Sequence, residues 1–275
     1  MRLDLGSDPG PAPDSGLQPG FPLETNRRAP DGRAGKEEVM NIACWSVKGG
    51  SGTSVTAALA ARRWADTSDT GALLVDLCGD AAGLLGVPEP ATPGVADWLN
   101  VGDEVQIDAL RRLEREVAAG LSLLHRGAGP LCRIDRAEVM ARELAADHRV
   151  TVVDGGCLWR AGGEEAGGAG AGGDPDDIDV RRRIVAAADR SWLVTRACFL
   201  ALRRAARAPL QPTGVVLLNE PGRPLTAGDV EDVVGAPVVL RIDVDPAVAR
   251  ATDAGLLASR VPAALDRVLT QAAPA

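Results

Sequence analysis

The sequence predicts a doubly wound α/β fold, with a mainly parallel sheet of about seven or eight strands and helices on both faces. Two observations carry this prediction. From Met40 onward, short runs rich in Val and Leu alternate with longer helix-forming segments. Continuous apolar runs of this kind are typical of parallel strands that helices cover on both faces. The chain of 275 residues is also long enough to bury a substantial core.

Strands are expected where a short apolar run is bounded by glycine, proline or a terminal carboxylate. These runs are residues 41–47, 72–76, 121–124, 149–154, 191–195, 214–219 and 237–242. The intervening segments, rich in Ala, Leu and Arg, predict helices. They are residues 53–65, 95–100, 107–117, 134–146, 176–188, 199–207, 226–234, 246–254 and 262–271.

The start of the chain differs from the rest. Residues 1–38 are rich in Pro and Gly and show no apolar periodicity, so they cannot bury enough surface to offset the entropy lost on ordering. We expect them to be a disordered tail, and residues 40–272 to form one domain. A Gly- and Ala-rich stretch, residues 161–175, predicts a flexible loop inside that domain.

The composition argues against several classes of function. The formal net charge is -8, and there are two Phe and no Tyr, so neither a basic coat nor aromatic platforms for stacked bases are expected. Arg203, Arg204 and Arg207 share one predicted helix. A solvated helix face is favoured there over contact with DNA phosphates, which stays an alternative. No apolar run of about 18 residues exists, so no stable membrane insertion is expected.

Five cysteines are scattered along the chain without a CxxC pair. This usage is typical of reduced thiols, and we expect a cytoplasmic protein. Because the chain has only two histidines, His125 and His148, a zinc site is not expected.

The most informative segment is residues 47–55, Val-Lys-Gly-Gly-Ser-Gly-Thr-Ser-Val. A predicted strand runs into a glycine-rich turn that opens a helix, and such a turn can wrap a phosphate with free backbone N–H groups. The hydroxyl of Ser54 could ligate Mg²⁺ at the helix start. An ordinary βα turn is the alternative. Lys48 favours the phosphate loop, because it is one of only two lysines in the chain and a compact charge suited to a phosphate oxygen.

The segment KGGSGTSV resembles the deviant Walker A loop of the ParA/MinD family of P-loop ATPases, with the pattern KGGxGK[ST][ST]. The resemblance implies a P-loop fold, ATP and Mg²⁺ as cofactors, and a homodimer in which Lys48 reaches the partner's nucleotide. It assigns nucleotide binding to the residues that follow Lys48, namely Gly49, Gly50, Ser51, Gly52, Thr53, Ser54 and Val55.

The resemblance extends over most of residues 40–270. LLVD, ending at Asp76, is similar to the family's switch I strand, and VTVVD, ending at Asp154, to its Walker B strand. Asp154 would then hold Mg²⁺ together with Ser54. GVVLLN resembles the strand whose final residue, here Asn219, reads adenine, and RIDVDPAVARATDAG resembles the segment that closes over the base and contains Asp245.

The departures from the family pattern concern catalysis. The second lysine, which holds the β- and γ-phosphates, is Thr53 here, and the switch I acid that positions the attacking water is Cys78. Asp80 lies two residues further on and could replace that acid only if the loop is rebuilt. Gly155-Gly156-Cys157 and the glycine-rich insertion stand where switch II is expected. This loss of catalytic residues resembles that of the CpaE/TadZ branch of the family.

These observations predict an ATP-binding, ParA/MinD-like protein with weak or lost hydrolysis. Its role would be spatial positioning or assembly, in chromosome partition, division-site placement or a pilus or secretion apparatus, with an unidentified protein partner. Lys48, Asp76 and Asp80 are the candidate catalytic residues. Two alternatives stay open: a scaffold that binds no nucleotide, and an active ATPase that relies on Asp80.

Overall fold

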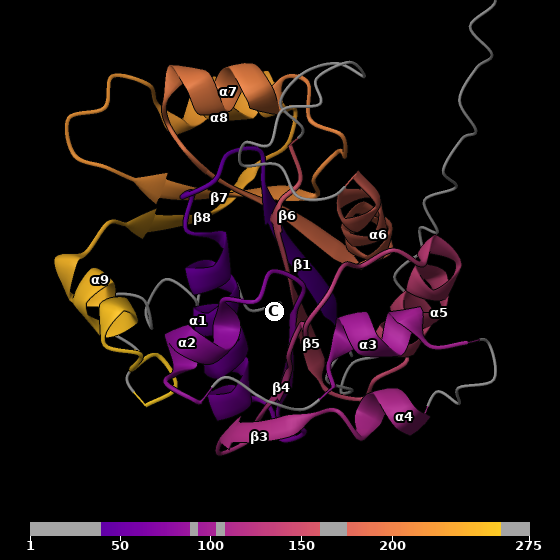
Figure 1. Ribbon diagram of the computed structural model, residues 1–275. Coiled ribbons are helices and arrows are strands. Elements are labelled where there is room, and N and C mark those ends of the chain that lie inside the picture. Colours follow the sequence, from indigo (N-terminus) through magenta and orange to yellow (C-terminus); the bar gives the residue numbers. More distant parts are fainter. Residues whose placement is uncertain (1–39, 89–92, 103–107, 160–174, 260–275) are drawn as a thin grey trace, which may run out of the picture. The chain divides into compact units, whose positions relative to one another are not determined.

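The computed structural model describes residues 40–88, 93–102, 108–159 and 175–259. The chain divides into two compact units, Met1–Lys36 and Glu37–Ala275, and all described residues belong to the second. Eight strands form one sheet in the order β3-β4-β2-β5-β1-β6-β7-β8 (Figure 1). The strands are β1 Asn41–Ser46, β2 Ala72–Asp76, β3 Arg115–Ala118, β4 Leu121–Leu124, β5 Val150–Cys157, β6 Arg190–Arg196, β7 Gly214–Asn219 and β8 Val238–Asp243.

Every strand pair is parallel except β3 with β4, which is antiparallel. This confirms the mainly parallel, doubly wound α/β sheet. The central strand β1 lies between β5 and β6, so the winding of the chain changes direction beside it. In such sheets ligands bind at the carboxyl ends of the strands near this switch point.

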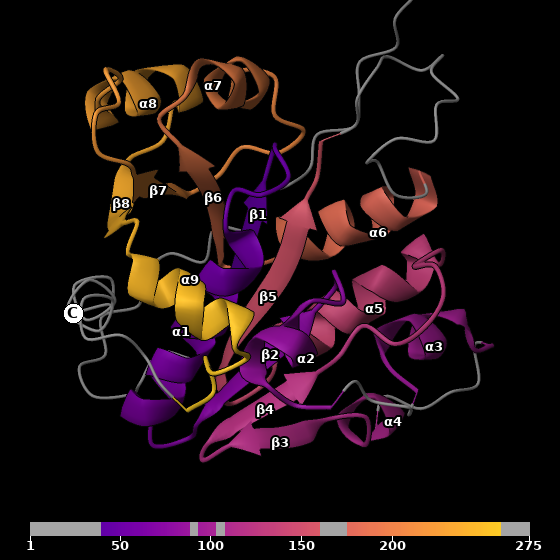
Figure 2. The same cartoon turned by 60° about the vertical axis from the view of Figure 1, so that its left-hand side comes forward.

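Helices cover both faces of the sheet (Figures 1 and 2). Alternate residues of β1 belong to opposite cores: Ile42 and Cys44 pack with α1, α2 and α9, whereas Ala43 and Trp45 pack with α3 to α8. The helices are α1 Thr53–Thr67, α2 Ala81–Leu85, α3 Val95–Asn100, α4 Asp108–Arg111, α5 Ile134–Ala145, α6 Pro175–Ala186, α7 Phe199–Ala205, α8 Ala227–Val234 and α9 Pro246–Asp253.

The predicted helix over residues 107–117 is wrong. Only Asp108–Arg111 is helical, and Arg115–Ala118 forms the edge strand β3. Gly120, with φ +69°, turns the chain back so that β3 pairs with β4. The short helix α2 was not predicted.

The strand expected to end at Asp154 continues to Cys157. Trp45 and Ser46 of β1 pair with Gly156 and Cys157 across this extension. The glycines permit it, because a Cβ added at Gly155 would lie 2.6 Å from Val185 Cγ2 and one at Gly156 would lie 2.3 Å from Cys78 Sγ. Larger residues would push the extended strand away from its neighbours.

Three sequence predictions fall outside the described residues: the tail over residues 1–38, positions 161–174 of the glycine-rich loop, and the helix over residues 262–271. In the part of the chain that the structure describes, no helix is long and apolar enough to cross a membrane. All five cysteines are free thiols.

Candidate functional site

The glycine-rich turn between β1 and α1 is built around two left-handed residues. Gly50 and Gly52 have φ of +73° and +81°, a region that side chains other than glycine rarely adopt. The Ser51 hydroxyl donates to the Lys48 carbonyl at 2.7 Å and closes the loop. A Cβ at Gly52 would lie 2.7 Å from Leu218 Cδ1, so the end of β7 lies directly against the loop.

Helix α1 begins immediately after this turn. No side chain of the described residues caps its first turn, so N–H groups at its start point out of the helix and carry a partial positive charge. Lys48 is half-buried at the base of the loop, while Thr53 is buried. Thr53 contributes no charge, so the cationic character of this site comes from backbone amides and Lys48.

Asp76 ends β2 and Asp154 lies beside it on β5, paired in register. Each carboxylate is 1% exposed. Asp76 Oδ1 accepts the N–H groups of Cys78 and Gly79 at 2.8 and 2.7 Å, and its Oδ2 accepts that of Ala81 at 3.0 Å. Burial raises the pKa of Asp76, and these three N–H donors offset part of the rise. Asp76 therefore anchors the loop that follows β2.

The Asp154 carboxylate accepts fewer backbone hydrogen bonds than that of Asp76. Its Oδ1 accepts the Gly156 N–H at 3.1 Å, whereas its Oδ2 is buried and has no hydrogen-bond partner among the described residues. Burial and the nearby charge of Asp76 raise the pKa of Asp154 to about 7, and the Ser54 hydroxyl and the Gly156 N–H offset part of this rise. A buried carboxylate with a free oxygen beside a helix-start hydroxyl fits Mg²⁺, which prefers oxygen ligands.

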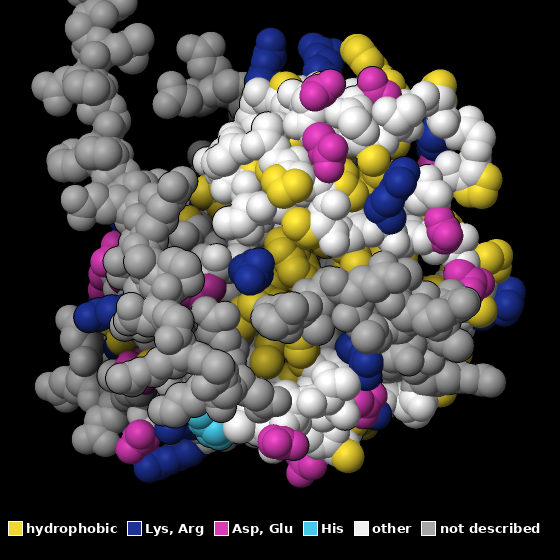
Figure 3. Space-filling model, turned by 180° about the vertical axis from the view of Figure 1, so that it is seen from behind, with side chains coloured by type: hydrophobic (Ala, Val, Ile, Leu, Met, Phe, Trp, Pro, Cys, Tyr) yellow, Lys and Arg dark blue, Asp and Glu magenta, His cyan; other side chains and the backbone are white. Residues whose placement is uncertain are grey.

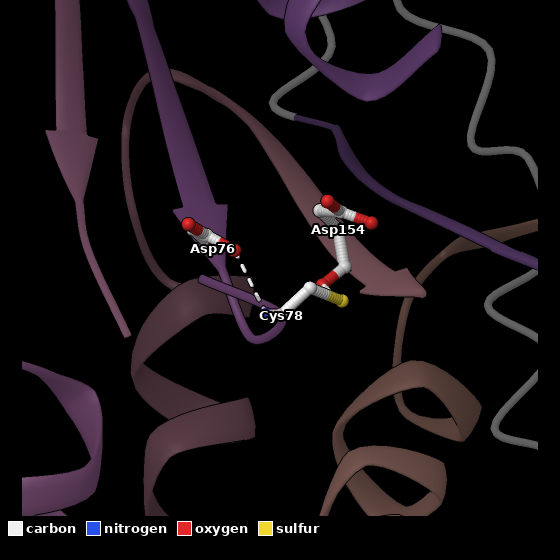
Figure 4. Close-up of side chains that lie close together, drawn as sticks. All are labelled: Asp76, Cys78 and Asp154. Carbon is white, nitrogen blue, oxygen red and sulfur yellow. Dashed lines mark hydrogen bonds between the residues drawn. The ribbon is translucent and has the colours of Figure 1, made fainter. Parts of the chain in front are cut away.

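Cys78 lies close to both carboxylates (Figure 4). Its Sγ is 3.5 Å from the Asp154 carbonyl oxygen. Burial, followed by the charges of Asp154 and Asp76, raises the pKa of the Cys78 thiol well above its usual range, so the thiol stays protonated at neutral pH. Asp80 is exposed at the start of α2, and the structure does not bring it into this buried group.

A buried ion-pair network holds the region where switch II was expected. Arg181 of α6 donates to the carbonyls of Gly155 and Cys157 at 3.2 and 3.5 Å, and it pairs with Asp177 at 2.7 Å. Asp177 also pairs with Arg126 at 2.5 Å, and Arg126 donates to the Leu77 carbonyl at 2.9 Å. Helix α6 is thereby tied to the segments that follow β2 and β4 and to the end of β5. Sequence reasoning missed this network, whose only signal was the i,i+4 spacing of Asp177 and Arg181.

Asn219 and Asp245 lie at the carboxyl ends of β7 and β8. The Asn219 amide donates to Asp243 Oδ1 at 2.6 Å. Asp245 Oδ1 accepts the Ala247 N–H at 2.7 Å and caps α9. Both side chains therefore have structural partners, and the contact between Gly52 and Leu218 places Asn219 near the loop.

The arginines predicted to share one helix do not form one surface, and Arg207 lies beyond the end of α7 at Ala205. Arg203 and Arg207 are exposed, but Arg204 is half-buried. It donates to the Val47 carbonyl at 3.5 Å and lies 5.8 Å from the centre of the Trp159 ring. Arg204 thus contacts the base of the glycine-rich loop, which the sequence did not indicate. On the face seen in Figure 3, basic and acidic side chains are interspersed around a central hydrophobic area.

Sequence comparisons find no matching family model and no significant match among curated proteins. Solved structures do match. A ParA family ATPase from Chlorobium tepidum TLS is 20% identical with a TM-score of 0.65, covering 85% of this chain and 97% of that one. The septum site-determining protein MinD complexed with Mg-ADP, from Pyrococcus horikoshii OT3, is 16% identical with a TM-score of 0.63, covering 85% and 94%.

A third match is an ATP complex of McdA from Cyanothece. It is 14% identical with a TM-score of 0.59, covering 86% of this chain and 96% of that one. These likenesses extend over nearly the whole length of the matched proteins and over the described sheet with its helices. The chain therefore has the P-loop fold of the ParA/MinD ATPases.

Proposed function

We propose that this chain is a ParA/MinD-like protein that binds ATP with Mg²⁺ and hydrolyses it weakly or not at all. One observation carries the proposal: a turn with two left-handed glycines opens an uncapped helix beside a buried carboxylate with a free oxygen. Backbone amides at a helix start bind phosphate, and the free carboxylate oxygen suits the accompanying cation. The matched MinD and McdA structures hold Mg-ADP and ATP, which supports the same ligand class here.

The proposed roles follow from position. The amides of the turn, from Gly49 to Val55, would hold the phosphates, and Lys48 would add a mobile positive charge, in the dimer from the partner's side. Ser54 and Asp154 would hold Mg²⁺, which when bound offsets phosphate charge. Asn219 and Asp245 would lie near the base, where both already organise the ends of β7 and β8.

Weak hydrolysis is supported by the residues at three positions where the family pattern has, or would need, a catalytic charge: Thr53, Cys78 and Asp80. Thr53 carries no charge to stabilise phosphoryl transfer. Cys78, protonated and packed against Gly156, cannot accept a proton from water as a carboxylate does. Asp80 is exposed, so an active ATPase that relies on it would need a rearranged loop.

A second candidate function is a scaffold that binds no nucleotide. It is favoured by the Arg181–Asp177–Arg126 network, because a nucleotide-dependent change near β5 would have to break buried ion pairs. Under either function we propose a role in positioning or assembly, exercised through an unidentified protein partner. The ATP-binding form would act as a homodimer.

Calorimetric titration of the full chain with Mg-ATP and Mg-ADP separates the two functions. We expect saturable binding of both nucleotides, and an ATP-dependent dimer by light scattering that Lys48→Ala abolishes. Arg203→Ala, which removes an exposed positive charge on α7, is the matched control. It should leave nucleotide binding and the ATP-dependent dimer unchanged. Absence of saturable heat at millimolar ATP would establish the scaffold in place of the nucleotide-binding protein.

A further inference from the structure

Asp76, Cys78 and Asp154 bring three metal-ligating atoms together at the carboxyl end of β2 and the adjoining part of β5 (Figure 4). Their ligand atoms all lie within 4.8 Å of one another. Among the described residues, no other group of three or more His, Cys, Asp or Glu side chains is placed in this way. The sequence hides the site, because its third ligand follows 76 residues after Cys78 along the chain.

Each of the three side chains has unused capacity to coordinate a cation. Asp154 is 1% exposed, and its Oδ2 accepts no hydrogen bond from any described residue. Asp76 Oδ2 accepts one N–H, that of Ala81, which leaves a lone pair. Cys78 Sγ makes only a weak contact, 3.5 Å long, with the Asp154 carbonyl. An unsatisfied buried carboxylate oxygen points to a missing positive partner.

We propose that Asp76, Cys78 and Asp154 form a binding site for a thiophilic divalent cation of the Zn²⁺ class. Sulfur selects Zn²⁺ and similar ions over Mg²⁺, whose ligands are oxygens. Two carboxylate oxygens and one thiolate provide three positions of a tetrahedral site, and water fills the fourth. The thiol proton, and the proton that the buried Asp154 carboxyl holds near neutral pH, leave to solvent as the metal–ligand bonds form.

The geometry requires only a small adjustment. Metal–sulfur and metal–oxygen bonds of about 2.3 and 2.0–2.2 Å bring tetrahedral ligands roughly 3.5 Å apart, so atoms that now lie up to 4.8 Å apart must approach by at most about 1.3 Å. Cys78 lies in the turn between β2 and α2, outside regular structure, and can provide that movement. The bound dication would also offset the crowding of two carboxylates and a thiolate.

This site goes beyond nucleotide binding and does not depend on it, although Asp154 serves both proposals. The test therefore uses the full chain without nucleotide and without a histidine tag. Co²⁺ serves as the probe, because cobalt–thiolate bonds absorb in the near ultraviolet, and Zn²⁺ and Mg²⁺ serve as competitors. We expect one equivalent of Co²⁺ with a thiolate band, which Zn²⁺ displaces at stoichiometric concentration and millimolar Mg²⁺ does not.

Cys78→Ser should abolish the thiolate band and weaken Co²⁺ binding at least about tenfold, since loss of even an outer-shell partner costs 10–100-fold. Cys132→Ser removes an exposed thiol and is the matched control, with binding unchanged. Asp154→Asn should weaken binding while a weakened thiolate band remains. The proposal is overturned if the wild-type chain gives no thiolate band, if the band survives in Cys78→Ser, or if Mg²⁺ displaces Co²⁺ as readily as Zn²⁺ does. The wild-type result alone decides the matter should a variant not fold.

Discussion

At the residue scale, Thr53 is the sharpest departure from the loop that this chain resembles. A lysine there would reach bound phosphates, and a charge-assisted contact of this type contributes about 1.5–3 kcal/mol. We expect Thr53→Lys to tighten Mg-ATP binding by roughly 10- to 100-fold in calorimetry. Thr53→Met adds similar length without charge and should not tighten binding. Equal affinities for the two variants would show that charge at this position does not limit binding.

The loop glycines differ in a way that can be measured. Gly52 has φ +81° and little space, whereas a Cβ at Gly49 would have no neighbour within 4 Å. We expect Gly52→Ala to lower the free energy of unfolding by about 1–2 kcal/mol, because alanine is strained in the left-handed region. Urea denaturation measures this loss. Gly49→Ala should cost clearly less, and equal losses would contradict the strain argument.

The identity of single residues predicted the glycine-rich loop of this site but not the contacts that other elements make with it. Glycine spacing and a rare lysine indicated the loop, because both reflect local backbone geometry and charge. The contact of Arg204 with the Val47 carbonyl and the anchoring of three N–H groups by Asp76 depend on elements that meet only in the folded chain. No spacing in the sequence encodes them.

At the element scale, the structure departs from the sequence prediction at β5, which continues to Cys157 and is attached to α6 through Arg181. Arg181 and Asp177 are both buried, and removing one partner of a buried ion pair costs about 3–5 kcal/mol. We expect Arg181→Leu to lower the free energy of unfolding by about 3 kcal/mol in urea denaturation. The backbone N–H of Leu158, bonded to Ser46, should exchange its hydrogen faster in this variant.

Arg183→Leu provides the matched control on the same helix. Arg183 pairs with Glu138, and both side chains are exposed, at 39% and 54%. Such a surface pair contributes at most about 1 kcal/mol. If Arg181→Leu and Arg183→Leu lower the free energy of unfolding equally, the Arg181 network does not stabilise the end of β5.

The elements themselves were predictable where one periodicity dominated. Strands β1, β2, β4 and β7 and helix α1 follow the expected ranges closely, since buried apolar runs and helix formers there are unambiguous. The helix prediction failed over residues 107–117 because the helix ends at Arg111, a turn follows at Arg112 and Leu113, and pairing with β4 then forms β3. Tertiary pairing overrode local propensity at this edge of the sheet.

At the scale of the whole molecule, the fold was far more predictable than the chemistry. The alternation of strands and helices constrains the sheet over many residues at once, so single errors such as β3 do not change the architecture. The site depends on a few side chains converging from β2, β5 and α1, and in the metal site that we propose, a single residue, Cys78, decides which cation fits.

The raised pKa of Asp154 makes the stability of the whole molecule depend on pH. Its carboxyl holds a proton in the folded chain up to about pH 7 but, in the unfolded chain, only below its ordinary value of 3.8. Between these values the folded state binds more protons, so the free energy of unfolding falls as pH rises and levels off above about pH 7. Burial is the main cause of this raised pKa, the charge of Asp76 and the more distant charge of Asp80 add to it, and the Ser54 hydroxyl and the Gly156 N–H oppose it.

Between pH 5 and pH 8 this one group should lower the free energy of unfolding by about 3 kcal/mol. Urea denaturation across this range measures the slope. Asp154→Asn cannot ionise, so its curve should lose most of that slope and lie above the wild-type curve at pH 8. Asp253→Asn, exposed on α9, should leave the slope unchanged. Parallel curves for the wild type and Asp154→Asn would mean that Asp154 is ionised throughout the range, with a cation or solvent satisfying its buried oxygen.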